Sequence, residues 1–181
     1  MNDRMAILGG TFTPLHDGHR ALLHSAFQTA SHDGDGDGHV VVGLTSTDLA
    51  TETRSDPSHA ELLGPFDARR DALEETLGRV SGAYTASYEI SKITDAYGPA
   101  VSREDADALI VAPEGKAHRR AHDLNDERID RGFRPLEIHT SPFVVAEDGH
   151  RISSTRIRDG EIDRHGRLLS AESTAESDRA Q

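Results

Sequence analysis

Two histidines stand three residues apart at the start of a helical pattern, directly behind a glycine-rich turn. They are His16 and His19, in the stretch "GGTFTPLHDGHRALL" (residues 9–23). Glycines such as Gly9 and Gly10 let a backbone approach a ligand closely. The first turn of a helix offers unpaired N–H groups and a positive dipole end, which favour phosphate. These residue types at this spacing therefore predict a phosphate-binding site with two imidazoles beside it.

Other sites for the same residues are weighed against this one. The chain has neither a G-x-x-x-x-G-K-[ST] nor, at this turn, a G-x-G-x-x-G, so it is not a P-loop or a dinucleotide fingerprint. It has no cysteine, which excludes disulfides, thiolate metal sites and cysteine nucleophiles. Two histidines need further ligands to hold a metal, and no third is close in sequence. His19 also shares the helix side of Leu22 and Leu23, so a structural histidine stays open.

The elements around this turn alternate between strand and helix. Residues 5–10 and 40–45 are short apolar runs typical of buried strands, and 18–29 repeats apolar residues at helical spacing. Strand, helix and strand within about forty residues indicate a βαβ unit. Further along we expect helices over 65–80, 116–132 and 152–162, strands over 84–90, 106–114 and 135–140, and an irregular segment over 46–64. The sequence thus predicts an α/β fold, a Rossmann-like open parallel sheet of about five strands, with ligands at the carboxyl ends of its strands.

A second polar segment lies near the end of this pattern. "RISSTRIR" (151–158) contains Ile-Ser-Ser-Thr-x-Ile-Arg, and "FRPLEI" (133–138) precedes it. Together with His-x-Gly-His at 16–19, in this order, these segments resemble the HxGH nucleotidyltransferase superfamily, and most of all its archaeal phosphopantetheine adenylyltransferases. The resemblance covers roughly residues 5–168. It implies the HxGH nucleotidyltransferase fold.

The resemblance also implies a reaction, the transfer of AMP from ATP to 4′-phosphopantetheine. The products would be dephospho-coenzyme A and pyrophosphate, in coenzyme A biosynthesis. Catalysis would come from positioning and from stabilising charge on the phosphate under attack, without a covalent enzyme intermediate. His19 would be the catalytic residue, in contact with the α-phosphate. Mg²⁺ would arrive with the ATP and need no carboxylate cage of its own.

The same resemblance implies which residues hold the two substrates. Those expected at the nucleotide are Gly10, Thr11, Phe12, His16, His19, Ser153, Ser154, Thr155 and Arg158. The acceptor is expected to contact the Thr11 hydroxyl, Glu114 at a strand end and Arg54, the nearest basic residue after the second strand. Arginine suits an anion with several oxygens because its guanidinium is a fork of donors.

Two positions depart from the family pattern. Thr13 stands where the family usually has Asp, and no lysine matches the one often found after the second strand. Three alternatives stay open beside this reaction. The first is a related nucleotidyltransferase that acts on glycerol phosphate, nicotinamide mononucleotide or a flavin precursor. The others are a nucleotide-binding protein without turnover and an acidic α/β scaffold whose motif is accidental.

The amino-acid composition limits which binding partners and which cellular compartment are expected. Acidic residues number 32 against 20 basic ones, the net charge is −12, and only Lys92 and Lys116 are lysines. Such a surface suits molar salt, where the Debye length is about 3 Å and self-repulsion is screened. We expect a cytoplasmic protein of a salt-loaded cell. A nucleic-acid backbone needs a basic face, so it is not expected as a partner, and no apolar run reaches the length of a membrane helix. A homo-oligomer stays open.

The remaining polar features are expected to be solvated. This holds for the helix arginines Arg69, Arg70, Arg119, Arg120 and Arg128, any one of which could instead reach the phosphates. "DGDGDG" (33–38) imitates a calcium loop, but its twelfth position is Leu44 rather than Glu, which favours a plain loop. Residues 1–168 are expected to form one domain, followed by a mobile acidic tail over 169–181.

Overall fold

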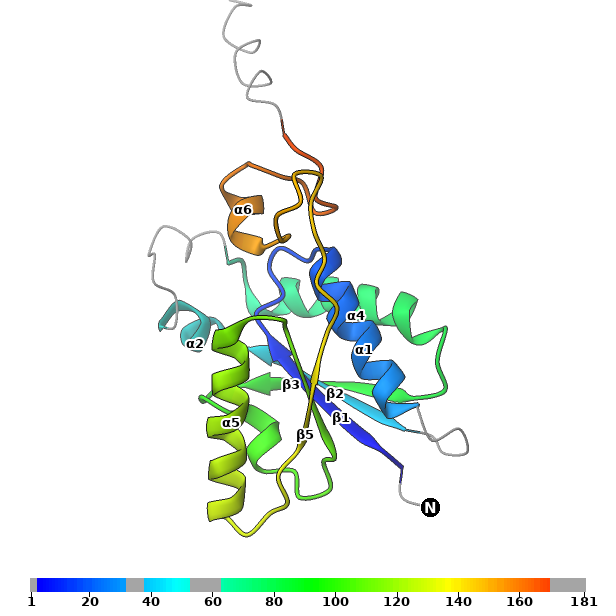
Figure 1. Ribbon diagram of the computed structural model, residues 1–181, viewed down its shortest axis with the longest axis vertical. Coiled ribbons are helices and arrows are strands. Elements are labelled where there is room, and N and C mark those ends of the chain that lie inside the picture. The colour runs from blue at the N-terminus through cyan, green and yellow to red at the C-terminus, as the bar shows by residue number, and fades with distance from the viewer. Residues whose placement is uncertain (1–2, 32–37, 53–62, 170–181) are drawn as a thin grey trace, which may run out of the picture.

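Five parallel strands form the centre of the molecule, in the order β3-β2-β1-β4-β5 (Figure 1). The structure, a computed structural model, describes residues 3–31, 38–52 and 63–169. Its elements are β1 (Met5–Gly10), α1 (Asp17–Ala30), β2 (His39–Thr45), α2 (Thr47–Glu52), α4 (Phe66–Ser81), β3 (Ser87–Ile93), the 3-10 helix η1 (Gly98–Val101), β4 (Ala108–Val111), α5 (Gly115–Asp130), β5 (Glu137–Thr140) and α6 (Ser154–Arg158). The predicted α/β class with an open, Rossmann-like sheet of about five parallel strands is confirmed.

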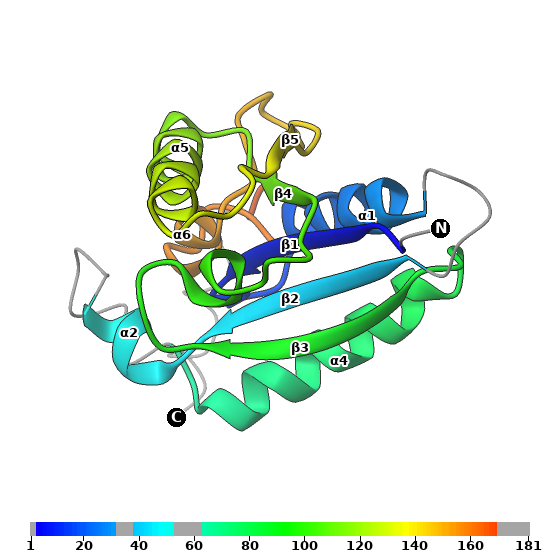
Figure 2. The ribbon, with the colours of Figure 1, turned by 90° about the horizontal axis from the view of Figure 1, so that it is seen from below.

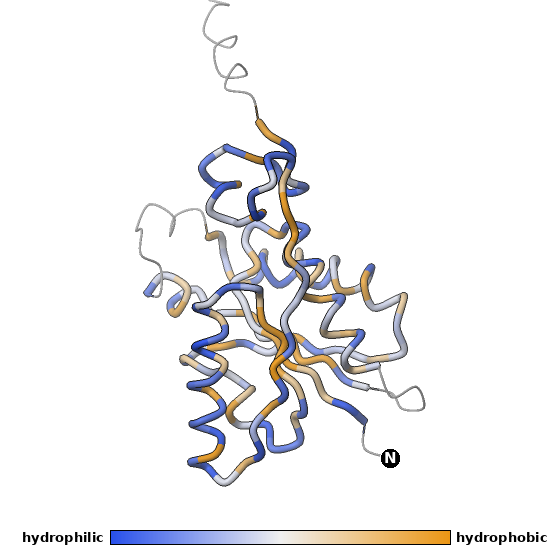
Figure 3. The backbone as a smooth tube through the Cα atoms, in the orientation of Figure 1, coloured by the Kyte–Doolittle hydropathy of each residue, from blue (hydrophilic) through white to orange (hydrophobic). Residues whose placement is uncertain are grey.

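Helices cover both faces of this sheet, as Figures 1 and 2 show. α1 and α4 pack on one face, whereas α5 and η1 pack on the other. Successive residues of β1 therefore enter different cores: Leu8 packs with Leu23 and Leu77, and Ile7 packs with Leu124. A strand buried on both faces needs apolar residues at every position, which explains the unbroken apolar runs of the sequence (Figure 3).

The order of the strands reverses next to β1. From β1 the chain moves outward through β2 to β3, then returns to place β4 on the other side of β1. Crossover connections on the two sides of this point leave a crevice at the carboxyl ends of β1 and β4. The loop behind β1 that carries the histidine pair and the loop behind β4 that carries Glu114 both begin there.

Two segments differ from the expectation. The segment 46–64 was predicted to be irregular, but α2 forms over Thr47–Glu52, where the Ser46 hydroxyl accepts from the N–H of Leu49 at 3.2 Å. β3 runs over Ser87–Ile93 rather than 84–90, because its pairing with β2 starts at Ser87 opposite His39. Tyr84 instead closes a turn and stacks on Phe27.

Arg128 of α5 is completely buried, so the expectation that it is solvated was wrong. Its guanidinium donates to the carbonyls of Ala100, Arg103 and Arg134 at 2.6–2.8 Å. Burial lowers its pKa from the ordinary value. These carbonyls belong to segments that end or connect helices and strands, where the backbone has no partner of its own. Arg128 is therefore a structural residue that ties three such segments together.

A small lobe of residues 142–169 lies beyond the end of the sheet and carries α6 (Figure 1). Its own apolar cluster is formed by Ala146, Ile152 and Ile162, with Val144 and Ile157 packed against it. Three earlier expectations, on residues 33–37 of the glycine-rich loop, on Arg54 and on the tail from residue 170, lie outside the described residues. Within the described part of the chain, no helix is long and apolar enough to cross a membrane.

Candidate active site

The loop between β1 and α1 is held in place by a buried arginine. Arg69 of α4 is 4% exposed, so the expectation of a solvated charge was wrong. Its guanidinium donates to the carbonyl of Thr45 at 2.9 Å and to that of Thr11 at 3.4 Å. It thereby joins the carboxyl end of β2 to the loop behind β1. In that loop Phe12 has φ 52, in the left-handed region, and its ring is buried 5.2 Å from the ring of His19.

The lobe of residues 142–169 holds the same loop from the other side. The Arg158 guanidinium donates to the carbonyl of Thr13 at 3.1 Å, and the Ser154 hydroxyl lies 3.5 Å from the carbonyl of Pro14. The N–H of Asp17 donates to the carbonyl of Arg164 at 3.1 Å. The two motifs are far apart in the sequence. These contacts place them side by side in the structure.

His16 and His19 stack on each other at the start of α1. Their ring centroids are 3.8 Å apart, with 28° between the ring planes. His16 is the residue before the helix, and a Cβ on Gly18 would lie 3.0 Å from its ring. A side chain at position 18 would therefore displace the imidazole, which explains the glycine between the two histidines.

Both imidazoles are neutral at neutral pH. Burial, followed by the charge of Arg151, lowers the pKa of His16 to about 4. Burial, followed by the charge of His16, lowers the pKa of His19 to about 3. The Nδ1 atoms of both rings are buried without a hydrogen-bond partner among the described residues. The pair therefore offers hydrogen-bonding groups that the described residues do not satisfy, a feature that favours a ligand at this place.

A pocket of about 270 Å³ lies against this pair. Both histidines line it, together with the polar residues Ser153, Ser154 and Thr155. The Ser153 hydroxyl also caps α6, where it accepts from the N–H of Arg156 at 3.3 Å. We call this space the histidine pocket. No group of three His, Asp or Glu side chains that could hold a metal ion occurs in the described residues.

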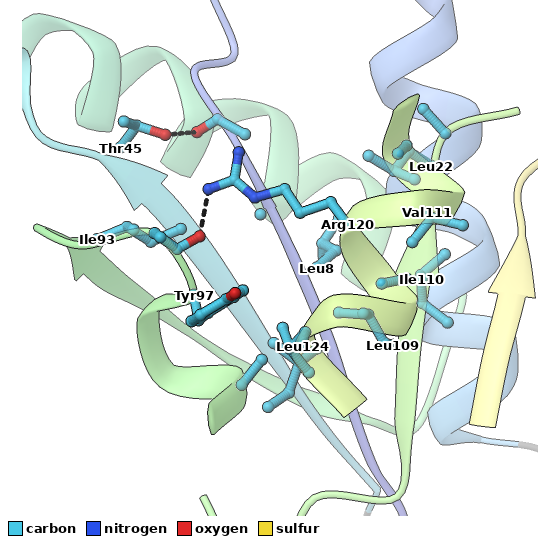
Figure 4. A pocket seen from close by; sticks show the side chains of 18 of the residues that line it. Leu8, Leu22, Thr45, Ile93, Tyr97, Leu109, Ile110, Val111, Arg120 and Leu124 are labelled. Atoms are coloured by element: carbon cyan, nitrogen blue, oxygen red, sulfur yellow. Dashed lines mark hydrogen bonds between the residues drawn. The ribbon is translucent and has the colours of Figure 1, made fainter. Parts of the chain in front are cut away.

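A second, larger pocket of about 340 Å³ adjoins the first (Figure 4). It lies between the sheet and α5, and apolar side chains such as Ile93, Leu109 and Leu124 form most of its walls. Arg120 extends across it and donates to the carbonyl of Ala96. We call this space the α5 pocket. The two pockets have three wall residues in common: Leu22, Ala112 and Glu114.

The structure brings most of the predicted site residues together. Gly10, Thr11 and Glu114 line the α5 pocket, and the predicted residues on the histidine pocket are His16, His19, Glu114, Ser153, Ser154 and Thr155. Phe12 and Arg158 are not among the wall residues of either pocket; Phe12 is buried below His19 and Arg158 braces the loop. Arg54 lies outside the described residues.

Sequence reasoning missed three basic residues at these pockets. Lys116 and Arg120 line the α5 pocket, and Arg151 lines the histidine pocket. Arg120 was expected to be a solvated helix charge or one that reaches the phosphates; it is exposed, and it also lines the α5 pocket. Lys116 and Arg120 are four residues apart and so share one face of α5, which was the available signal. Arg151 stands directly before the Ile-Ser-Ser-Thr run, but its partner Glu114 is brought close only by the fold.

Comparison with known proteins agrees with this architecture. A model of the cytidylyltransferase-like family matches residues 7–160. The phosphopantetheine adenylyltransferase of Methanosarcina mazei is 42% identical over 89% of this chain and 94% of that protein. That of Methanothermobacter thermautotrophicus is 36% identical over 91% and 89%. The crystal structure of a protein of unknown function from Archaeoglobus fulgidus superimposes with a TM-score of 0.59, 28% identity and coverage of 77% and 89%.

The extent of these matches settles the family. They span both motifs and every strand of the sheet, and the sequence identity holds over nearly the whole length of the relatives. The chain belongs to the cytidylyltransferase-like family and, within it, to the phosphopantetheine adenylyltransferases, which are nucleotidyltransferases.

Proposed function

We propose that the protein transfers the AMP group of MgATP to 4′-phosphopantetheine, giving dephospho-coenzyme A and pyrophosphate. The observation that carries this proposal is the histidine pocket, which joins His16 and His19 to residues 153–155. The chain around this pocket is 42% identical to a phosphopantetheine adenylyltransferase. The pocket contains neutral donors and hydroxyl groups, which suit a polyphosphate whose own charge is partly balanced by Mg²⁺.

The proposed reaction is an in-line displacement at phosphorus. An oxygen of the acceptor's phosphate attacks the α-phosphorus of ATP, and a new P–O bond forms. The bond between that phosphorus and the oxygen bridging to the β-phosphorus breaks, and its electron pair leaves with pyrophosphate. The protein needs to align the reactants and stabilise charge at the α-phosphate.

His19 is proposed to donate a hydrogen bond to an α-phosphate oxygen as negative charge develops there. A neutral imidazole keeps one N–H at neutral pH, so donation requires no proton uptake. His16 and residues 153–155 would bind the other phosphate oxygens. Arg158 would act through the loop, because its guanidinium holds the carbonyl of Thr13. Gly10 and Phe12 would shape the backbone on which the nucleotide lies.

The α5 pocket is proposed to take the acceptor. Its volume of about 340 Å³ and its apolar walls suit an elongated, largely uncharged arm. Thr11 lies on its wall, close to the loop that carries the histidines, and there the hydroxyl would meet the acceptor's phosphate. Lys116 and Arg120 line the same pocket and would supply the positive charge that was expected of Arg54. Glu114 lies where the two substrates would meet.

An acceptor panel tests the proposed function. Pyrophosphate release from ATP would be measured with 4′-phosphopantetheine, glycerol 3-phosphate, nicotinamide mononucleotide and flavin mononucleotide. Only the first is expected to give release above the rate without acceptor. Release with a different acceptor would reassign the substrate. Tight ATP binding without release on any acceptor would instead identify a nucleotide-binding protein without turnover.

We also propose that this reaction takes place in a salt-rich cytoplasm. The proposal rests on the net charge of −12 and on the presence of only two lysines among the 20 basic residues. A surface with this excess of carboxylates repels itself in dilute buffer, and the repulsion is screened at molar salt.

A further inference from the structure

Arg151 is the only arginine or lysine among the described residues that line the histidine pocket. Arg158, which lies near it, donates to the carbonyl of Thr13 and to the Thr155 hydroxyl at 3.1 and 3.3 Å. A triphosphate placed in the pocket would carry several negative charges into a partly enclosed space. Anions in such spaces are stabilised by charge-assisted hydrogen bonds, and the arginine fork matches phosphate oxygens well.

The guanidinium of Arg151 is paired with the carboxylate of Glu114. Both side chains are partly open to solvent, with 34% and 43% of their surfaces exposed. Glu114 is the residue before α5 and lines both pockets, whereas Arg151 lines only the histidine pocket. The ion pair therefore lies at the boundary between the histidine pocket and the α5 pocket. Arg151 and His16 both line the histidine pocket, and the charge of Arg151 is the main contribution after burial to the lowered pKa of His16.

We propose that Arg151 binds the phosphates of the nucleotide, and that Glu114 competes with them for its guanidinium. On nucleotide binding, Arg151 would exchange one carboxylate oxygen of Glu114 for phosphate oxygens. The negative charge of Glu114 would then be left at the wall of the α5 pocket. This inference deepens the proposed function and rests on it for the identity of the bound anion as ATP.

A purely structural role for the pair makes a different prediction. If the pair only fastens the start of α5 to the lobe of residues 142–169, removal of either partner breaks the same contact. Changes of Arg151 and of Glu114 would then affect phosphate binding in the same direction. If Glu114 competes with phosphate, the two changes act in opposite directions, because one removes the phosphate ligand and the other removes its competitor.

The test uses inorganic triphosphate as the probe, because it has no base or ribose to contact Glu114. Its dissociation constant, and that of ATP, would be measured by isothermal titration calorimetry with Mg²⁺ present. We expect R151Q to weaken triphosphate binding about 10- to 100-fold, as the loss of charge-assisted hydrogen bonds predicts. E114Q is expected to strengthen it about 3- to 10-fold. R151K should fall between R151Q and the wild type, since it keeps the charge and loses the fork.

The matched control is R167Q, which removes one positive charge from the same lobe. Arg167 is exposed and is not among the wall residues of either pocket. R167Q should bind triphosphate within about twofold of the wild type, which separates loss of net charge from loss of a ligand. In the E114Q/R151Q double variant the gain in triphosphate affinity caused by E114Q should disappear, because no Arg151 guanidinium remains to be released from Glu114.

Two results would overturn the inference: triphosphate binding by R151Q equal to that of the wild type, or weaker binding by both R151Q and E114Q. If R151Q does not fold, as judged by thermal unfolding, R151K takes its place. Triphosphate binding should then be weaker than wild type in R151K and stronger than wild type in E114Q. Either negative result leaves the proposed function intact as long as the wild type releases pyrophosphate with 4′-phosphopantetheine. An absence of that release would contradict the proposed function and not the triphosphate site.

Discussion

His16 and His19 lie face to face with ring centroids 3.8 Å apart, and neither ring is charged at neutral pH. Two imidazolium ions at this separation would repel each other in a partly buried place. At the proposed phosphate site the protein thus offers neutral donors, and the positive charge on the wall of the histidine pocket comes from Arg151. This arrangement suits a reaction in which charge moves across a phosphate and no proton needs to be taken up by the enzyme.

The first prediction concerns His19. His19→Ala is expected to lower the rate of pyrophosphate release at least about 100-fold, with only a modest loss of ATP affinity, because a donor to the transition state is lost. Steady-state kinetics and calorimetry with ATP measure the two effects separately. His24→Ala is the matched control, since His24 lies on the same helix and bonds to the Tyr84 hydroxyl away from both pockets. A His19→Ala enzyme of normal rate would remove this residue from the mechanism.

The second prediction concerns stability in acid. In the unfolded chain both histidines have a pKa near 6.5, whereas in the folded protein the values are about 4 for His16 and about 3 for His19. Below pH 6.5 the unfolded state therefore binds protons that the folded state excludes, and stability falls as the pH drops toward these folded values. The loss is up to about 1.4 kcal/mol per pH unit for each histidine.

Urea unfolding of the wild type and of His19→Asn between pH 4.5 and 8 checks this prediction. The variant lacks the imidazole of His19, so its free energy of unfolding should depend less steeply on pH below 6.5. The difference in slope should vanish above pH 7, where both states are neutral at this position. Parallel curves over the whole range would contradict the lowered pKa of His19.

The third prediction places the acceptor in the α5 pocket. Ala117 lines this pocket from α5 and is only partly buried, so Ala117→Phe narrows the space without a large change in the core. We expect the KM for 4′-phosphopantetheine to rise at least about tenfold through steric exclusion, while ATP affinity is unchanged. Arg119→Phe places the same ring on an exposed position of the helix and should leave both constants unchanged. An unaltered KM in Ala117→Phe would exclude this pocket as the acceptor site.

The fourth prediction concerns salt. If the proposed adaptation to salt holds, carboxylate repulsion destabilises the folded protein in dilute buffer, and its screening at molar salt restores stability. The melting temperature should therefore rise from 0.05 M to 2 M KCl, and more than it does for a relative of near-neutral net charge. Most of the rise should occur below about 0.5 M KCl if screening is the cause. A melting temperature independent of KCl would contradict the proposed adaptation to salt.

Much of the fold could be predicted because local and global signals agree. The apolar runs of β1 and β2 indicate buried strands, and the amphipathic α1 between them provides the crossover helix that two parallel strands need. α2 was missed because it is short and has Ala50 as its only buried residue, so apolar periodicity carries no signal there. The position of β3 was missed because alternation continues on both sides of Ser87, and only the register with β2 fixes where pairing begins.

The two motifs of the candidate site could be predicted from the sequence, but the partners of its arginines could not. The His-x-Gly-His and Ser-Ser-Thr segments each carry a local pattern, and the structure places them on one pocket. The positions of the Arg69, Arg128 and Arg151 guanidinium groups depend on carbonyls and carboxylates from distant segments. Nothing in the helical pattern distinguishes a buried arginine from a solvated one, because the partners are chosen by the tertiary fold.

Identification of the product made from ATP and 4′-phosphopantetheine is the decisive measurement for the proposed reaction. We predict that mass spectrometry will detect dephospho-coenzyme A and pyrophosphate in equal amounts, formed by the wild type at least about 100-fold faster than by His19→Ala. Dephospho-coenzyme A formed equally fast by both proteins would contradict the mechanism. Its complete absence with the wild type, at any KCl concentration, would contradict the proposed function itself.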